Sequence, residues 1–148
     1  MKNKITEEKN KILMTENRWM LLADDDPEDT EMLLEAILSI APTSRIKSFL
    51  DGRSLLDFLA NGTDRLKPCT IILDYNMPKM NGLDVLKELA GNHSLAHIPK
   101  LIWSTSDREE NVSACINGGA VEYLVKPTDP GELSRLAKKI LGYCMGSA

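Results

Sequence analysis

Short apolar runs that each stop at a polar residue are the feature that most constrains how this chain folds. Four such runs alternate with stretches of helical pattern. They lie at residues 19–23, 70–73, 101–103 and 121–125, and the residues that end them are Asp24, Asp74, Ser104 and Lys126. Continuous apolar runs of this length are typical of strands that are buried on both faces of a parallel sheet.

Helical patterns separate these runs, and two of them begin at clear start signals. Asp26 stands before Pro27, and Asp129 stands before Pro130. An aspartate N-cap accepts hydrogen bonds from the free N–H groups of a helix start, and proline is tolerated at the first helical position. The expected helices lie at residues 28–40, 54–60, 83–89 and 109–117 and in the stretch from Asp129 to Cys144, with a further short strand at 45–49.

Five strands alternating with five helices predict an α/β fold, in which helices cover both faces of a parallel sheet. The expected arrangement is flavodoxin-like and doubly wound, with a five-stranded parallel sheet in the order 2-1-3-4-5. Residues 18–145 are expected to form this one domain, with no output domain. Residues 1–17 are expected to be a flexible N-terminal extension.

The polar residues that end the strands are expected to meet in one cleft, because ligands bind outside the carboxyl ends of the strands in an open parallel sheet. Asp24, Asp25 and Asp74 would crowd negative charge there, since two unit charges about 4 Å apart repel by about 4 kcal/mol at an effective dielectric near 20. Oxygen ligands of this kind favour Mg²⁺. With Lys126 and Ser104 as partners for phosphoryl oxygens, the set predicts that Asp74 forms an acyl phosphate.

Each of these residues also has an ordinary structural explanation when it is taken alone. Asp26 is interpreted as the N-cap of the first helix and not as a metal ligand. Ser104 or Ser106 could cap the helix that follows, and Glu109 stands three residues after Ser106. Lys126 alone could be a surface lysine. The joint occurrence of polar residues at four strand ends favours the functional interpretation.

Composition argues against several classes of protein. The net charge of -4 is unlike that of a nucleic-acid binder. No apolar run approaches the roughly 20 residues of a membrane span, and the N-terminal residues do not read as a secretory signal. We therefore expect a cytoplasmic protein with no nucleic-acid or membrane partner. Cys69, Cys115 and Cys144 form no C-x-x-C pair, and they are interpreted as free thiols in a reducing cytoplasm.

Over residues 18–143 the sequence resembles the receiver domain of two-component response regulators. The segments that carry the resemblance are LADDDP at 22–27, ILDYNMPKMNG at 72–82, WST at 103–105 and GAVEYLVKP at 119–127. The resemblance implies that Asp74 takes a phosphoryl group from a sensor histidine kinase. It also implies that Mg²⁺ is held by Asp24, Asp25, Asp74 and the backbone carbonyl of Asn76.

The resemblance assigns roles to four further positions. Ser104, Thr105 and Lys126 are expected to bind the phosphoryl group, and Tyr123 is expected to turn inward as a switch when Ser104 is drawn to the phosphate. The bond between Lys126 and Pro127 is expected to be cis, a form that persists only where the structure demands it. Tyr123 alone could equally be a half-buried strand residue. Thr105 is larger than the usual alanine, which affects water access to the phosphoryl group.

A narrower resemblance rests on the long loops at 61–68 and 91–99 and on the DPED segment at 26–29. These features are similar to those of single-domain regulators that are paired with phytochrome-type histidine kinases. The resemblance implies such a kinase as partner, a downstream protein target or phosphotransfer protein, and a possible homodimer.

The expected function is therefore that of a stand-alone response regulator, a phosphoacceptor and not an enzyme, which switches partner binding or relays the phosphoryl group. One alternative is a pseudo-receiver, a protein-binding module that never takes phosphate. Another is a phosphatase with an aspartyl-phosphate intermediate. Phosphatases that resemble haloacid dehalogenases need a second acid two residues after the nucleophile, and this chain has Asn76 there.

Overall fold

One sheet of five parallel strands, in the order β2-β1-β3-β4-β5, forms the centre of the protein in this computed structural model. The structure describes residues 18–61 and 67–144, so the expected N-terminal extension and most of the loop expected at 61–68 lie outside the described residues. The strands are β1 (Arg18–Ala23), β2 (Arg45–Phe49), β3 (Lys67–Asp74), β4 (Lys100–Ser104) and β5 (Glu122–Val125).

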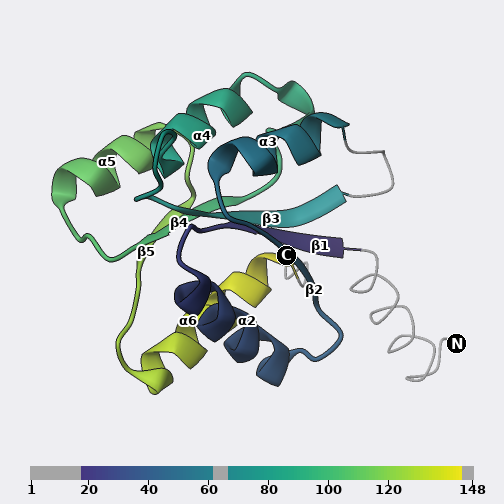
Figure 1. The fold of residues 1–148 in the computed structure, drawn as a ribbon, viewed down its shortest axis with the longest axis vertical. Coiled ribbons are helices and arrows are strands. Elements are labelled where there is room, and N and C mark those ends of the chain that lie inside the picture. The colour runs from purple at the N-terminus through teal and green to yellow at the C-terminus, as the bar shows by residue number, and fades with distance from the viewer. Residues whose placement is uncertain (1–17, 62–66, 145–148) are drawn as a thin grey trace, which may run out of the picture.

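Helices cover both faces of this sheet (Figure 1). They are α2 (Pro27–Ile40), α3 (Gly52–Asn61), α4 (Gly82–Ala90), α5 (Glu109–Asn117) and α6 (Pro130–Cys144), with a short 3-10 helix η1 (His93–Leu95) before β4. Helices α2 and α6 lie on one face, and α3, α4 and α5 lie on the other. The predicted flavodoxin-like fold and its strand order are confirmed.

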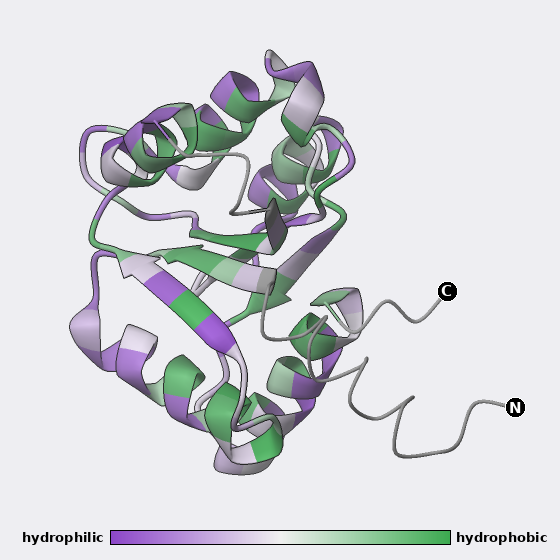
Figure 2. Cartoon of the chain, turned by 90° about the vertical axis from the view of Figure 1, so that its right-hand side faces the viewer, coloured by the Kyte–Doolittle hydropathy of each residue, from purple (hydrophilic) through white to green (hydrophobic). Residues whose placement is uncertain are grey.

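The central strands supply a core to each face of the sheet. Leu22 and Ile72 point toward α2 and α6, whereas their neighbours Leu21 and Ile71 point toward α3 and α4. This alternation follows from the two-residue period of a strand, and burial of both faces explains why the runs are continuously apolar. Figure 2 shows central strands that are largely hydrophobic, whereas the edge strand β2 alternates between hydrophilic and hydrophobic residues. Among the described residues, no helix has the length and apolar character needed to cross a membrane.

The helix starts show which capping predictions hold. Asp26 is the N-cap of α2, and its Oδ1 accepts hydrogen bonds from the N–H groups of Glu28 and Asp29. The alternative that Ser104 or Ser106 caps α5 does not hold, because the N-cap position is held by Arg108, which makes no side-chain cap. The two hydroxyls accept bonds within the loop before that helix instead.

The expectation of a cis bond before Pro127 is also wrong, since the described residues contain no cis peptide bond. Even before proline, the trans form is intrinsically favoured by about 0.5–1 kcal/mol.

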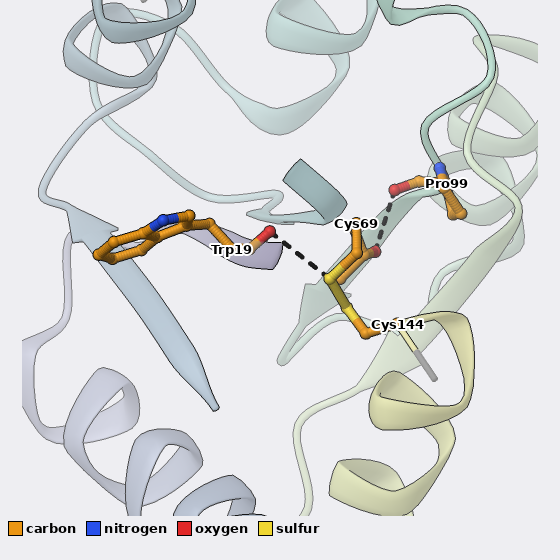
Figure 3. Close-up of a disulfide and its surroundings, with 5 residues drawn as sticks. Trp19, Cys69, Pro99 and Cys144 are labelled. Atoms are coloured by element: carbon orange, nitrogen blue, oxygen red, sulfur yellow. Dashed lines mark hydrogen bonds between the residues drawn. A yellow bond between two sulfur atoms is a disulfide. The ribbon is translucent and has the colours of Figure 1, made fainter. Parts of the chain in front are cut away.

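Cys69 and Cys144 form a disulfide, which overturns their interpretation as free thiols (Figure 3). The end of α6 packs beside the start of β3, so the two Cα atoms lie 5.0 Å apart, within the range that a disulfide spans. The two residues are 75 positions apart, and their spacing gives no hint of this contact. Cys115 is the free, buried thiol that was expected, and burial raises its pKa to about 11.

Candidate functional site

The carboxyl ends of four strands bring the predicted site residues together. Asp24 follows β1, Asp74 ends β3, Ser104 ends β4 and Lys126 follows β5. The strands are parallel, so their carboxyl ends share one edge of the sheet. Asp24, Asp74 and Ser104 are buried, with exposed fractions of 0%, 3% and 0%. Residues spread over about a hundred positions therefore lie together at one edge of the sheet.

Three carboxylates in this site are arranged so that they could hold a metal ion. Asp24, Asp25 and Asp74 each offer one oxygen, and these oxygens lie within 4.8 Å of one another. The N–H of Asp26 donates to Asp24 Oδ1 at 2.9 Å, and the N–H of Asn76 donates to Asp74 Oδ1 at 3.2 Å. These bonds orient the two buried carboxylates. Asp25 is exposed, so the cluster is open to solvent on its side. An all-oxygen cluster with one open side suits a hard divalent cation that keeps some of its water.

The ammonium of Lys126 lies among the acids of this site. Its Nζ is 3.0 Å from Asp24 Oδ2, 2.8 Å from Asp29 Oδ2 and 3.5 Å from Asp74 Oδ2. Burial by itself lowers the pKa of Lys126, but the hydrogen bonds to Asp29 and Asp24 and the charges of Asp24 and Asp74 outweigh burial and raise it. Lys126 therefore carries a full positive charge, which offsets part of the negative charge of the cluster.

Asp74 is poised to exchange a proton near neutral pH. Burial, followed by the charge of Asp24, raises its pKa to about 7, and the charge of Lys126 acts in the opposite direction. A carboxylate must be ionised to act as a nucleophile. A cation at the carboxylate cluster would favour the ionised form, because an opposite charge close to an acid lowers its pKa.

Hydroxyl and aromatic side chains complete the site. Ser104 Oγ accepts hydrogen bonds from the N–H of Ser106 at 3.1 Å and from Asn76 Nδ2 at 3.5 Å. Thr105 is exposed beside it. Tyr123 is half-buried, and its hydroxyl donates to the backbone carbonyl of Ser106 at 2.8 Å. The tyrosine is thus tied to the same loop that bonds to Ser104.

This arrangement agrees with a family comparison. Residues 20–138 match the family described as the response regulator receiver domain. The chain belongs to this family. The receiver domain is also 35% identical over 122 residues to the two-component response regulator ORR3 of Oryza sativa subsp. indica, a match that covers 82% of this chain and 89% of that one. It is 28% identical to the probable methanogenesis regulatory protein FilR2 of Methanothrix harundinacea, over 86% of this chain and 83% of that protein.

Solved structures similar to this receiver domain include regulators of phytochromes. The phosphorylated cyanobacterial phytochrome response regulator RcpA is 25% identical with a TM-score of 0.78, and the match covers 89% of this chain and 96% of that one. The bacteriophytochrome response regulator AtBRR is 29% identical with a TM-score of 0.67, over 85% and 93% of the two chains. The narrower resemblance to phytochrome regulators is thus confirmed as a structural likeness.

Two residues that contact Lys126 were not predicted from the sequence to lie at the candidate site. Asp29 lies on α2 and bonds to Lys126, and the ring of Trp103 on β4 has its centroid 4.7 Å from Lys126 Nζ. Asp29 lies three residues after the N-cap Asp26. An acid at that position is common at helix starts, so the sequence offers no specific indication of its bond to Lys126. Trp103 reads as a core residue, and it is indeed only 2% exposed.

Gly82 is a further requirement of the site that was not foreseen. A Cβ atom at this position would lie 2.7 Å from the backbone carbonyl oxygen of Asp74. The N–H of Gly82 also donates to the carbonyl of Tyr75 at 3.0 Å. The loop after β3 can therefore close onto the end of that strand only with glycine here.

Proposed function

We propose that this receiver domain accepts a phosphoryl group on Asp74 from the phosphohistidine of a sensor histidine kinase. One observation carries the proposal: Lys126, whose side chain is only 9% exposed, lies within 3.5 Å of both Asp24 and Asp74 at the carboxyl ends of the strands. A nucleophilic carboxylate, a cluster able to hold a cation and a fixed ammonium are the parts that phosphoryl transfer needs.

Mg²⁺ is the proposed cofactor. Asp24, Asp25, Asp74 and the backbone carbonyl of Asn76 would hold it, and the clustering of the three carboxylates supports this assignment. When bound, the cation supplies charge neutralisation for the transferred phosphoryl group. The response regulator Rcp1, which is 25% identical to this chain, has been solved in an Mn²⁺-bound form.

The protein's own residues act on the phosphoryl group in a simple order. A carboxylate oxygen of Asp74 forms a bond to phosphorus, and the bond from phosphorus to the histidine nitrogen breaks, with its electron pair remaining on that nitrogen. Lys126, the hydroxyl of Ser104 and the exposed Thr105 beside it bind the phosphoryl oxygens. Hydrolysis of the acyl phosphate returns Asp74 to its first state. The protein is thus a self-acting phosphoacceptor rather than a turnover enzyme.

The proposed output is altered binding to a downstream protein or onward transfer to a phosphotransfer protein. When Ser104 is drawn to the phosphoryl group, the Ser106 loop moves with it and Tyr123 turns inward. Tyr123 is bonded to that loop, which supports this coupling. We propose a phytochrome-type kinase as the partner because similar structures are regulators of phytochromes. We further propose that the protein acts in the cytoplasm, where such a kinase would present its phosphohistidine.

The test is the intact mass of the protein after incubation with acetyl phosphate and Mg²⁺. We expect one added phosphoryl group, which is absent in Asp74→Asn and absent with a chelator. Asp57→Asn is the matched control, because Asp57 is an exposed aspartate on α3. A phosphoryl group that persists in Asp74→Asn contradicts the proposal. If no group is seen at all, failure of the protein to bind beryllofluoride, a stable phosphoryl mimic, also contradicts it and favours a pseudo-receiver.

A further inference from the structure

Asp29 holds the phosphoryl-binding lysine although it is not one of the candidate metal ligands. Its Oδ2 atom lies 2.8 Å from Lys126 Nζ, closer than the oxygens of Asp24 at 3.0 Å and Asp74 at 3.5 Å. The acids that could share a metal, within the described part of the chain, are Asp24, Asp25 and Asp74. The ammonium therefore lies nearer to an acid on α2 than to the acid that it would serve.

The local structure of α2 explains why Asp29 is available for this contact. An acid at the third position of a helix commonly bonds back to the N–H of the N-cap residue. Here the N–H of Asp26 donates instead to Asp24 Oδ1 at 2.9 Å. The side chain of Asp29 has no N-cap N–H to bind, and it extends to Lys126 across 97 positions of sequence.

The indole of Trp103 bounds the ammonium on another side. The ring centroid is 4.7 Å from Lys126 Nζ, within the distance at which a cation is attracted to an aromatic face. The side chain of Lys126 is 9% exposed and that of Asp29 is 27% exposed. Lys126 is thus enclosed between a buried ring and a partly solvated acid, and Asp29 is the neighbour that solvent can most readily replace.

We propose that Asp29 is a positioning residue that retains Lys126 in the unphosphorylated protein and competes with the phosphoryl group for its ammonium. The inference rests on the proposed function of Asp74. A phosphoryl group on Asp74 attracts the ammonium toward its own oxygens, and the 2.8 Å bond from Lys126 to Asp29 opposes that movement. Asp29 therefore sets how readily the phosphorylated state forms, without touching the reacting atoms.

The fluorescence of Trp103 reports on the position of the Lys126 ammonium, which lies 4.7 Å from its ring centroid. The chain has two tryptophans, and Trp19→Phe leaves Trp103 as the single one. In this background, beryllofluoride is titrated at saturating Mg²⁺ into the parent, Asp29→Asn and Glu28→Gln, and Trp103 fluorescence is followed. Glu28→Gln is the matched control, since it removes the same charge from the same helix turn at an exposed residue.

We expect Asp29→Asn to lower the half-saturating beryllofluoride concentration by about three- to tenfold, as loss of a partly solvated charged hydrogen bond predicts. Glu28→Gln leaves it unchanged. Binding of Mg²⁺ alone does not tighten in Asp29→Asn, because a negative charge near the cation has been removed. A variant that binds beryllofluoride more tightly but does not bind Mg²⁺ more tightly is not expected if Asp29 has a merely structural role.

Two results overturn the inference. Equal or weaker beryllofluoride binding in Asp29→Asn shows that Asp29 does not compete for Lys126. An equal gain in Glu28→Gln shows that only the overall charge matters. Failure of the proposed function itself looks different, because the parent and both variants then bind no beryllofluoride.

Discussion

The hydroxyl of Tyr123 on β5 donates a hydrogen bond to the backbone carbonyl of Ser106, 2.8 Å away, and so joins an aromatic side chain to the loop that follows β4. The N–H of Ser106 in turn donates to the hydroxyl of Ser104. A single peptide loop thus connects the candidate phosphoryl-binding hydroxyl to the candidate switch residue. We expect these two bonds to transmit a displacement of either end to the other.

Tyr123→Phe is expected to loosen this loop. Loss of the bond to Ser106 destabilises the unphosphorylated conformation by about 0.5–1.5 kcal/mol. Faster amide hydrogen exchange of the loop between β4 and α5 is the expected result, while acetyl phosphate still modifies Asp74. Tyr143→Phe is the control, since Tyr143 lies in the last turn of α6 and not in this loop. Unchanged loop exchange in Tyr123→Phe would show that the bond does not restrain the loop.

Asp74→Asn is expected to stabilise the protein at alkaline pH in the absence of metal. Burial and the charge of Asp24 raise the pKa of Asp74 to about 7 from an ordinary 3.8, so the folded state binds the proton more tightly than the unfolded chain. The stability due to this group is fully present below pH 3.8 and is lost as pH rises through 7. At pH 8 we expect the variant to exceed the parent by about 1–3 kcal/mol.

Urea unfolding with a chelator, at pH 5.5 and at pH 8, measures this difference. The gain from Asp74→Asn should be clearly smaller at the lower pH, where the parent carboxyl is protonated. Asp57→Asn again serves as an exposed control. A gain of the same size at both pH values would mean that the charge of Asp74 is not the destabilising element.

Mg²⁺ binding is expected to depend on Asp25 and not on Asp26. Asp25→Asn removes one of three clustered carboxylates. We expect it to lower the affinity for Mg²⁺ by at least about tenfold, as is typical when a metal site loses one of its groups. Asp26→Asn should bind Mg²⁺ as the parent does, because asparagine is an equally good N-cap. Isothermal calorimetry compares the two neighbours directly. A similar loss in both variants would indicate general charge rather than ligation.

Reduction of the Cys69–Cys144 disulfide is expected to lower the free energy of unfolding. The bond closes a segment of 75 residues, and disulfides of this kind typically contribute about 2–4 kcal/mol. Denaturant unfolding of the parent with and without a reductant measures the effect. Cys144→Ser should unfold alike under both conditions. A parent that is insensitive to reductant would show that α6 is held to β3 by packing alone.

The fold was predictable from the sequence because it is encoded in local patterns. Apolar runs that end in polar residues locate the strands, and the bounds of β2 and α5 match the expected residues 45–49 and 109–117. The site followed from the same patterns through a general rule of parallel sheets, which places strand ends at one edge. No contact between side chains had to be known in advance.

Two of the features that could not be predicted are contacts between elements that are far apart in the chain. The pairing of Cys69 with Cys144 depends on where α6 ends relative to β3, and a change of one helical residue would move the sulfur away. The bond from Asp29 to Lys126 likewise depends on how α2 is placed against β5. Sequence periodicity gives the face of a helix but not the residue that it meets.

The distance in sequence between Asp24 and Lys126, which is 102 positions, also bears on how the protein is made. On the ribosome the acids at the ends of β1 and β3 emerge well before the lysine that offsets their charge. Until β5 is added, those carboxylates have no partner from that strand, and they repel one another if β1 and β3 pair. The lysine that offsets this charge is thus added only after the last strand of the sheet, so the full set of candidate site residues exists only once synthesis has passed β5.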